Sequence, residues 1–182
     1  IITESGADFG WVIVCIGEFD PRQAAGSSQP DLRLEKSDLL WVDLGIVIHG
    51  YHTDYCRGLV ARGASSAQLQ KWGKIHKILE AGVEATMPGI PSSDLYRVQV
   101  STAEKLNIDM TSWPAQRFGH GSGLHTTEPP YISRDDETIL EPGMILHIEP
   151  GCIEKDGIYV LEEQVLVTES GSKVLSHAPW EL

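Results

Sequence analysis

The chain has 182 residues, of which 41% are hydrophobic, and this is enough to bury one core of ordinary size. Its formal net charge of −12 excludes free nucleic acid as an expected partner, because duplex binding requires a basic surface. We therefore expect one domain, over residues 1–182, that acts on something other than nucleic acid.

Cysteine usage and hydropathy limit where the protein works. Cys15, Cys56 and Cys152 lie far apart and form no CxxC pair, so we expect a reducing, cytoplasmic compartment rather than a disulfide framework. No apolar run is long enough to span a bilayer, and we expect no membrane partner. Ile1-Ile2 is neither a start methionine nor the beginning of a signal peptide, which suggests the ordered part of a longer protein.

The N-terminal third of the chain predicts strands. Residues 9–19 and 39–48 are apolar and rich in β-branched and aromatic side chains, which is typical of buried strands. His49-Gly50 is expected to turn the second of these strands into a third, over residues 51–61. Residues 21–31 have the composition of a loop.

Two amphipathic helices are predicted next. Apolar residues recur every three or four positions from Leu69 to Met87, which predicts a helix over residues 69–86 with Ser65 or Ser66 as its N-cap. Pro91 and the residues after it begin a second helix that ends near residue 106. We expect both helices to cover a sheet face as scaffold.

The C-terminal half predicts an irregular segment followed by strands. Residues 113–127 are rich in glycine, and Pro129-Pro130 are expected to prevent regular structure after them. Residues 140–148 predict a strand that is entered through a Pro-Gly turn. Gly157 is expected to turn a hairpin into a strand over residues 158–168.

Four acidic residues lie in these apolar strands, where an ionised carboxylate is costly unless it is paired or bound to a metal. They are Asp43, Asp54, Glu149 and Glu162. In each half of the chain an acid precedes a glycine, in DLG and in EPG, and the returning strand carries a second acid. This faint internal repeat predicts two related half-sheets that face each other and bring the four carboxylates together.

Each of these residues also has a purely structural interpretation. Asp54 could pair with Arg57, three residues later, and Glu149 could cap the turn at Pro150. His120, taken alone, could be an ordinary loop histidine. All these interpretations would have to hold at once, so we favour a shared metal site.

His120 adds one imidazole to the four carboxylates, and this mixture suits Mn, Co, Fe or Zn rather than a thiolate-type site. Two such ions could share carboxylates, activate a water molecule and hold an acyl oxygen, which is the chemistry of amide hydrolysis. Gly119, Gly121 and Gly123 around the histidine would let the backbone approach a ligand closely. A phosphate loop is disfavoured, because the sequence has neither GK[ST] nor a strand–GxGxxG–helix order.

Five motifs over residues 39–175 resemble the catalytic domain of the M24 metallopeptidases, the group of prolidase, Xaa-Pro aminopeptidase and methionine aminopeptidase. They are VDLG (42–45), TDYCR (53–57), GHGSGL (119–124) with EPP (128–130), LEPGMILHIEPG (140–151) and EEQVLVTESG (162–171). The resemblance implies an α/β pita-bread fold, the creatinase/aminopeptidase fold of two pseudo-symmetric half-sheets with covering helices. It implies that the usual N-terminal domain of the family is lacking here.

The resemblance also implies a set of site residues. The family's five metal ligands correspond to Asp43, Asp54, His120, Glu149 and Glu162. Glu162 is preferred to Glu163 because the family acid stands six residues before a threonine, here Thr168. The short interval between Glu149 and Glu162 is similar to that of prolidases. Arg57 and Glu163 are expected to support the ligands from behind.

Three departures from the family pattern concern the residues that hold the substrate. A second family histidine is replaced by Thr127, which Glu128 follows, and His125 lies two residues earlier, where in a strand it would point to the same side. Another family histidine is absent from residues 24–28, and a family arginine is Val160 here. We therefore name His125, Thr127 and Glu128 as catalytic or substrate-contacting residues.

Three functions are compatible with this pattern. The first is a dinuclear metal-dependent hydrolase of a small amide or an Xaa-Pro dipeptide-like substrate; the sequence does not show its oligomeric state, and the resemblance implies a homodimer as one option. The second is an M24-type enzyme with altered chemistry, either a hydrolase of a non-peptide substrate or a lyase. The third is a pita-bread module that binds a partner without catalysis.

Overall fold

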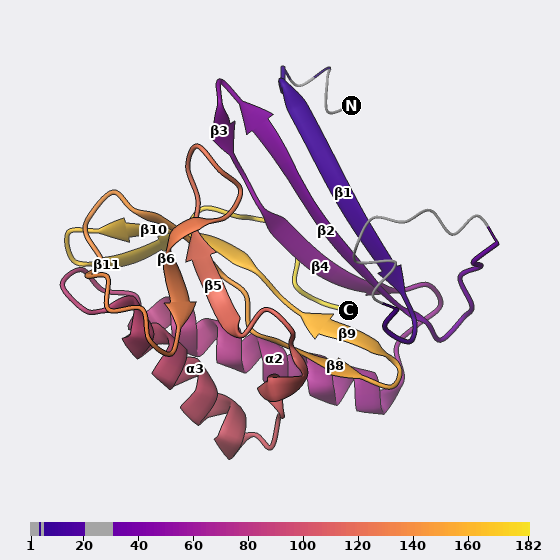
Figure 1. The fold of residues 1–182 in the computed structure, drawn as a ribbon. Helices are drawn as coiled ribbons and strands as arrows, with labels where there is room; N and C mark the ends of the chain where they lie inside the picture. The colour runs from indigo at the N-terminus through magenta and orange to yellow at the C-terminus, as the bar shows by residue number, and fades with distance from the viewer. Residues whose placement is uncertain (1–3, 5, 21–30) are drawn as a thin grey trace.

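The computed structural model describes residues 4, 6–20 and 31–182. In this part of the chain the strands form three sheets, and two α-helices lie along one side of the molecule (Figure 1). Figure 1 shows the first sheet, formed by the N-terminal strands, next to a second sheet formed by the C-terminal half. The mixed α/β composition agrees with the predicted fold class.

The first sheet is built around one long strand. β2 (Leu39–Ile48) pairs antiparallel with β1 (Phe9–Ile16), β3 (Tyr51–His52) and β4 (Tyr55–Val60). The predicted strand over residues 39–48 is confirmed, and the strand predicted for residues 9–19 ends at Ile16. The strand predicted for residues 51–61 is broken at residues 53–54. Of the predicted loop over residues 21–31, all but residue 31 lies outside the described residues.

The second sheet has the order β11-β10-β7-β5-β6. Its strands are β5 (Arg117–Gly121), β6 (Glu128–Ser133), β7 (Ile145–Ile148), β10 (Glu163–Thr168) and β11 (Gly171–Val174). β8 (Gly151–Glu154) and β9 (Gly157–Val160) form a separate hairpin. The strand predicted over residues 140–148 therefore begins only at Ile145, and the strand predicted over residues 158–168 is interrupted at residues 161–162.

Two predictions for the Gly-rich segment were wrong. Residues 117–121 form strand β5, inside the sheet, rather than an irregular loop. Pro129 and Pro130 lie within strand β6, joined by a cis peptide bond. β6 is the edge strand of its sheet, where a proline without an N–H removes no hydrogen bond from a second neighbouring strand.

The glycines of β5 are required by neighbouring backbone. A Cβ atom on Gly119, whose φ is +149°, would lie 2.3 Å from the carbonyl oxygen of His147 on β7. A Cβ atom on Gly121 would lie 2.6 Å from the carbonyl oxygen of Pro129 on β6. These two glycines therefore allow close strand packing on both sides of His120, instead of the approach of a ligand.

Helix α2 (Ser66–Ala85) was predicted closely. Ser65 is its N-cap and forms a capping box with Gln68, and the helix ends at the C-cap Thr86. Its buried face includes Trp72, Ile75 and Leu79, which belong to the main hydrophobic core. α2 and α3 (Ser92–Lys105) contact each other and the second sheet, and a short 3₁₀ helix, η2 (Met110–Ser112), leads into β5.

The described helices leave the outer face of the first sheet uncovered, although Trp72 of α2 lies against Gly58 of β4. The outer face of the first sheet exposes Val12, Val14, Leu44 and Leu59, and in the described part of the chain no helix packs on it. Neither α2 nor α3 is long and apolar enough to cross a membrane. The two halves of the molecule therefore have similar strands but differ in how far helices cover their sheets.

Candidate metal centre

The five predicted ligands lie either within strands or directly at the ends of strands. Asp43 lies within β2, and His120 lies within β5. Asp54 occupies the break between β3 and β4, whereas Glu162 occupies the break between β9 and β10. Glu149 directly follows β7. The second acid of each half therefore lies at a break between two strands, whereas the internal repeat predicted it within a continuous returning strand.

The five side chains converge between the two sheets. The Nε2 atom of His120 lies 3.6 Å from Oδ2 of Asp54 and 3.6 Å from Oε1 of Glu149. Ligand atoms of Asp54, His120 and Glu162 all lie within 4.8 Å of one another, and all three residues are buried. The charge of Asp43 contributes to the raised pKa of Asp54, so the fifth residue also lies close to the cluster.

Burial and mutual repulsion make these carboxyls hard to ionise. Burial, followed by the charge of Glu162, raises the pKa of Asp43 to about 7 and the pKa of Asp54 still further. The same two causes raise the pKa of Glu149 well above its ordinary value, and burial raises the pKa of Glu162 to about 8. Carboxyls this close together either remain partly protonated or are neutralised by bound cations.

The free lone pairs of the cluster fit divalent cations. Oδ1 of Asp43, Oδ1 of Asp54 and Oε1 of Glu162 are buried and have no hydrogen-bond partner. Nδ1 of His120 lies 2.9 Å from the carbonyl oxygen of Gly121, so a proton on Nδ1 leaves the lone pair of Nε2 directed at the acids. Burial lowers the pKa of His120 to about 3, which keeps the imidazole neutral. Oxygen and imidazole donors with unused lone pairs are the donor set of Mn, Co, Fe or Zn.

The purely structural interpretation of Asp54 required an ion pair with Arg57, but Arg57 has other partners. Its guanidinium instead forms an ion pair with Glu163 and donates to the carbonyl oxygen of Glu162. Glu163 also accepts a hydrogen bond from Ser176, so it faces the C-terminal tail. Arg57 and Glu163 therefore contact each other next to Glu162, and their supporting role stays a prediction.

The sequence analysis did not identify His147, which lies at this site. It is fully buried on β7, its ring stacks on that of His120 at 5.2 Å, and its Nδ1 lies 2.9 Å from Oε1 of Glu162. The signal was present, because side chains two positions apart on a strand share a face, and Glu149 is two positions after His147.

Arg117 was also missed. Its Nε atom lies 3.8 Å from Oε1 of Glu149 and is buried without a hydrogen-bond partner, while its guanidinium lies over the ring of Tyr131. The charge of Arg117 opposes the rise in the pKa of Glu149. Arg117 is thus a fixed positive charge at the edge of the acidic cluster.

Two of the predicted substrate-contacting residues, His125 and Thr127, lie in the loop between β5 and β6, and the third, Glu128, is the first residue of β6. Residues 122–127 are not a strand, so the argument that His125 and Thr127 share a side does not apply. His125 is exposed, and the carboxylate of Glu128 accepts a hydrogen bond from its backbone N–H. The hydroxyl of Thr126 lies 2.9 Å from Nδ1 of His52, which ties this loop to the first sheet.

The remaining departures from the family pattern divide into two cases. Val160 is fully buried and packs with Trp41 and Cys56, so this position is part of the core. Residues 24–28 lie outside the described residues.

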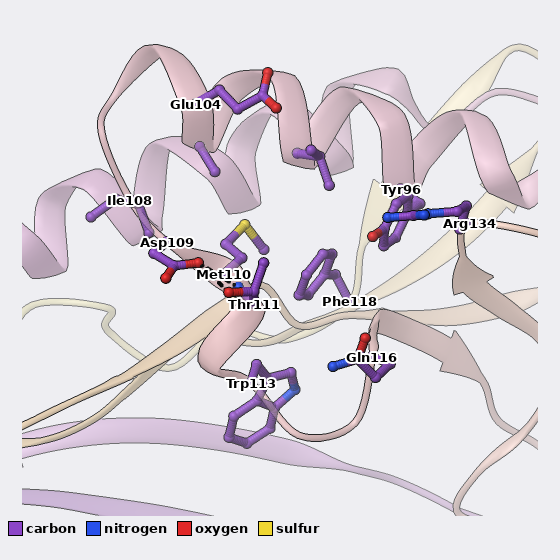
Figure 2. Close-up of a pocket in the computed structure, with 12 residues that line it drawn as sticks. Tyr96, Glu104, Ile108, Asp109, Met110, Thr111, Trp113, Gln116, Phe118 and Arg134 are labelled. Atoms are coloured by element: carbon purple, nitrogen blue, oxygen red, sulfur yellow. Dashed lines mark hydrogen bonds between the residues drawn. The ribbon is translucent and has the colours of Figure 1, made fainter.

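A separate cavity of about 350 Å³ lies between α3 and η2 (Figure 2). Phe118 and Tyr96 stack at 5.2 Å in its wall, and Met110 and Trp113 also line it. The carboxylate of Asp109 at this cavity accepts hydrogen bonds from Thr111. None of the predicted ligands lines it, so we assign the chemistry to the acidic cluster.

Comparison with known proteins identifies the family of the chain. The sequence profile of metallopeptidase family M24 matches residues 4–169. The Xaa-Pro dipeptidase of Pyrococcus furiosus is 33% identical over 153 residues, which cover 84% of this chain and 43% of that protein. The chain therefore spans less than half the length of this curated relative.

Solved structures show the same fold. The prolidase from Pyrococcus furiosus superposes with a TM-score of 0.85 at 30% identity, over 98% of this chain and 52% of that one. Dipeptidase PepE from Mycobacterium ulcerans gives a TM-score of 0.87 at 27% identity, over 100% of this chain and 48% of that one. With its pita-bread fold and its buried cluster of acids around a neutral histidine, the chain belongs to metallopeptidase family M24.

Proposed function

We propose that residues 1–182 are the catalytic domain of a dinuclear metal-dependent hydrolase that acts on Xaa-Pro dipeptides or similar small amides. The observation that carries this proposal is the convergence of four buried or half-buried carboxyls on one neutral imidazole, in which buried oxygens of three of the acids lack hydrogen-bond partners. The names of the related proteins, Xaa-Pro dipeptidase and prolidase, support the choice of substrate. Because those relatives are about twice as long, the activity of the whole protein is part of the proposal.

The cluster would hold two divalent ions through Asp43, Asp54, His120, Glu149 and Glu162, with Mn, Co, Fe or Zn as the expected metals. When bound, such ions supply the Lewis acidity that activates water and polarises the scissile carbonyl. The free thiols of the three buried cysteines support a reducing, cytoplasmic location. A homodimer stays one option for its assembly.

The loop over residues 122–127 supplies the groups that would meet the substrate. Glu128 holds the backbone of His125 and leaves its exposed imidazole free to contact a substrate or carry a proton. Thr127 is half-buried beside them. Arg117, next to Glu149, presents a fixed positive charge that would favour an anionic group of the substrate.

Val160 favours a second candidate function. A valine that is fully buried in an apolar cluster cannot supply the positive charge that the family pattern has at this position. This loss is compatible with an M24 enzyme that processes a non-peptide substrate by hydrolysis or elimination. The experiment described next distinguishes the two candidate functions.

The test removes metal with a chelator, reloads the protein with Mn or Co, and measures the hydrolysis of Xaa-Pro dipeptides. We expect turnover that depends on metal, and we expect Asp54→Asn to lose both turnover and metal. Asp135→Asn, at an exposed acid, is the matched control and should retain both. A protein that takes up metal but leaves all dipeptides intact would favour the second candidate, and a protein that takes up no metal would overturn both.

A further inference from the structure

We propose that His147 is a sixth side-chain ligand of the metal centre, and that its Nδ1 atom binds the cation held by Glu162. This inference rests on the proposed function, because it requires the acidic cluster to bind divalent ions. It adds a second nitrogen donor to the five ligands that the family resemblance implies.

The position of His147 aims its side chain at the cluster. It lies on β7, in register with His120 on β5 and with Gln164 on β10. Its side chain is fully buried and stacks on the ring of His120, with 26° between the ring planes. Glu149, two residues further along the chain, leaves the same face of the backbone. His147 therefore enters the site beside two of the predicted ligands.

The contact between His147 and Glu162 has the distance of two ligands on one ion. Nδ1 of His147 lies 2.9 Å from Oε1 of Glu162, yet both atoms are buried without a hydrogen-bond partner. Two donors that each lie about 2.1 Å from one octahedral ion, at right angles, are about 3 Å apart. The separation suits a shared cation, while the orientation does not suit a hydrogen bond.

The other end of the ring can be held by a protein acceptor. A histidine that binds metal through one nitrogen usually donates its second N–H to an oxygen. The side-chain amide of Gln164 lies 3.5 Å from Nε2 of His147, and rotation of the amide by a half turn would present its oxygen there. Donation from Nε2 to that oxygen would leave the lone pair of Nδ1 for a cation beside Glu162.

Paramagnetic NMR of the protein loaded with Co(II) counts the bound imidazoles directly. Each histidine that ligates Co(II) gives one strongly shifted, exchangeable N–H signal, so we expect two such signals, from His120 and His147. His147→Leu should retain one signal and should bind Co(II) at least about tenfold more weakly. His147→Asn, which places an amide oxygen near the position of Nδ1, should recover part of the affinity but not the second signal.

Matched controls and opposing outcomes complete the experiment. His76→Gln removes a histidine from the surface of α2 and should keep both signals and the wild-type affinity. One shifted signal in the wild type, or two signals in His147→Leu, would overturn the inference and leave the five-ligand centre standing. A wild type that binds no Co(II) would overturn the proposed function as well. The wild-type signal count decides the question even if a variant fails to fold.

Discussion

A buried carboxylate such as Glu162 persists only if something replaces the water that it lost on folding. Arg57 is the nearest cation, but it binds the backbone carbonyl of Glu162 and the carboxylate of Glu163 instead. Oε1 of Glu162 is thereby left without a hydrogen bond in a fully buried position. At the scale of single residues, this unpaired atom is the strongest sign that cations belong in the cluster.

His125 gives a test of the substrate side of the site. It lies in an exposed loop, so His125→Ala should leave metal content and stability unchanged while kcat for Xaa-Pro dipeptides falls by about 10²-fold. Metal analysis and steady-state kinetics on the same preparation measure both quantities. Unchanged turnover would remove His125 from the reaction and would leave Thr127 and Glu128 as the loop residues to examine.

At the residue scale, the candidate site residues that could be predicted from the sequence were charged residues within apolar segments. Acids inside apolar strands, such as Asp43 and Glu149, are conspicuous because an unpaired charge in such a place is costly. His147 and Arg117 were not conspicuous, because a histidine or an arginine in a strand has many ordinary roles. Only the registers that place His147 beside His120 and Gln164 show its role, and register is a property of the folded sheet.

At the scale of elements, strand β5 shows how glycine misled the prediction. Its composition is typical of a loop, yet the strand pairs with β6 on one side and β7 on the other. The helices were easier to predict, because the spacing of apolar residues and the capping box at Ser65 are local signals. The breaks at Asp54 and Glu162 could not be predicted, since they depend on how the two halves meet.

Gly119 tests whether β5 needs its glycines for packing. Gly119→Ala would push a Cβ atom toward the backbone of β7, so we expect a loss of about 1–3 kcal/mol in the free energy of unfolding. Gly73→Ala, in an open position of helix α2, is the matched control and should stabilise the protein by about 0.5–1 kcal/mol. Urea unfolding of both metal-free variants provides the comparison. Equal stability of Gly119→Ala and wild type would contradict the packing role.

At the scale of the whole molecule, both halves contribute residues to the acidic cluster, but the second half and the helices form most of the core. The helices and the second sheet form the main core, whereas the first sheet leaves an apolar face with Val12 and Leu59 exposed. The candidate metal site lies where the halves meet, and the proposed ligands come from both. Cation binding should therefore stabilise the fold as a whole, because it fastens the first sheet to the second.

The pH dependence of stability follows from the opposite pKa shifts of acids and histidines. The lowered pKa values of His120 and His147 make the unfolded chain bind more protons than the fold below pH 6.5. The free energy of unfolding therefore rises with pH up to about 6.5, and these two histidines do not change it further above that pH. The raised pKa values of Asp43, about 7, and Glu162, about 8, make the fold hold extra protons, so stability is lost as the pH rises through them. Between pH 6.5 and 8, therefore, only the raised pKa values of the acids affect the stability, and the two histidines no longer do.

In this window we expect the metal-free protein to become less stable as the pH rises. Each carboxyl still protonated in the fold costs up to about 1.4 kcal/mol per pH unit. Saturating Mn(II) should abolish or reverse the trend, because the cation replaces the protons. Urea unfolding at the two ends of the window, with chelator and with metal, measures the effect. A metal-free protein whose stability is constant or rises with pH would show that the acids are neutralised in some other way.

The most direct test of the metal centre is an anomalous-scattering map from crystals loaded with Mn or Co. We predict two peaks between the sheets, each about 2.0–2.3 Å from ligand atoms of Asp43, Asp54, His120, Glu149 and Glu162. A map with no peak among these five side chains, from crystals soaked at a saturating metal concentration, would contradict the account.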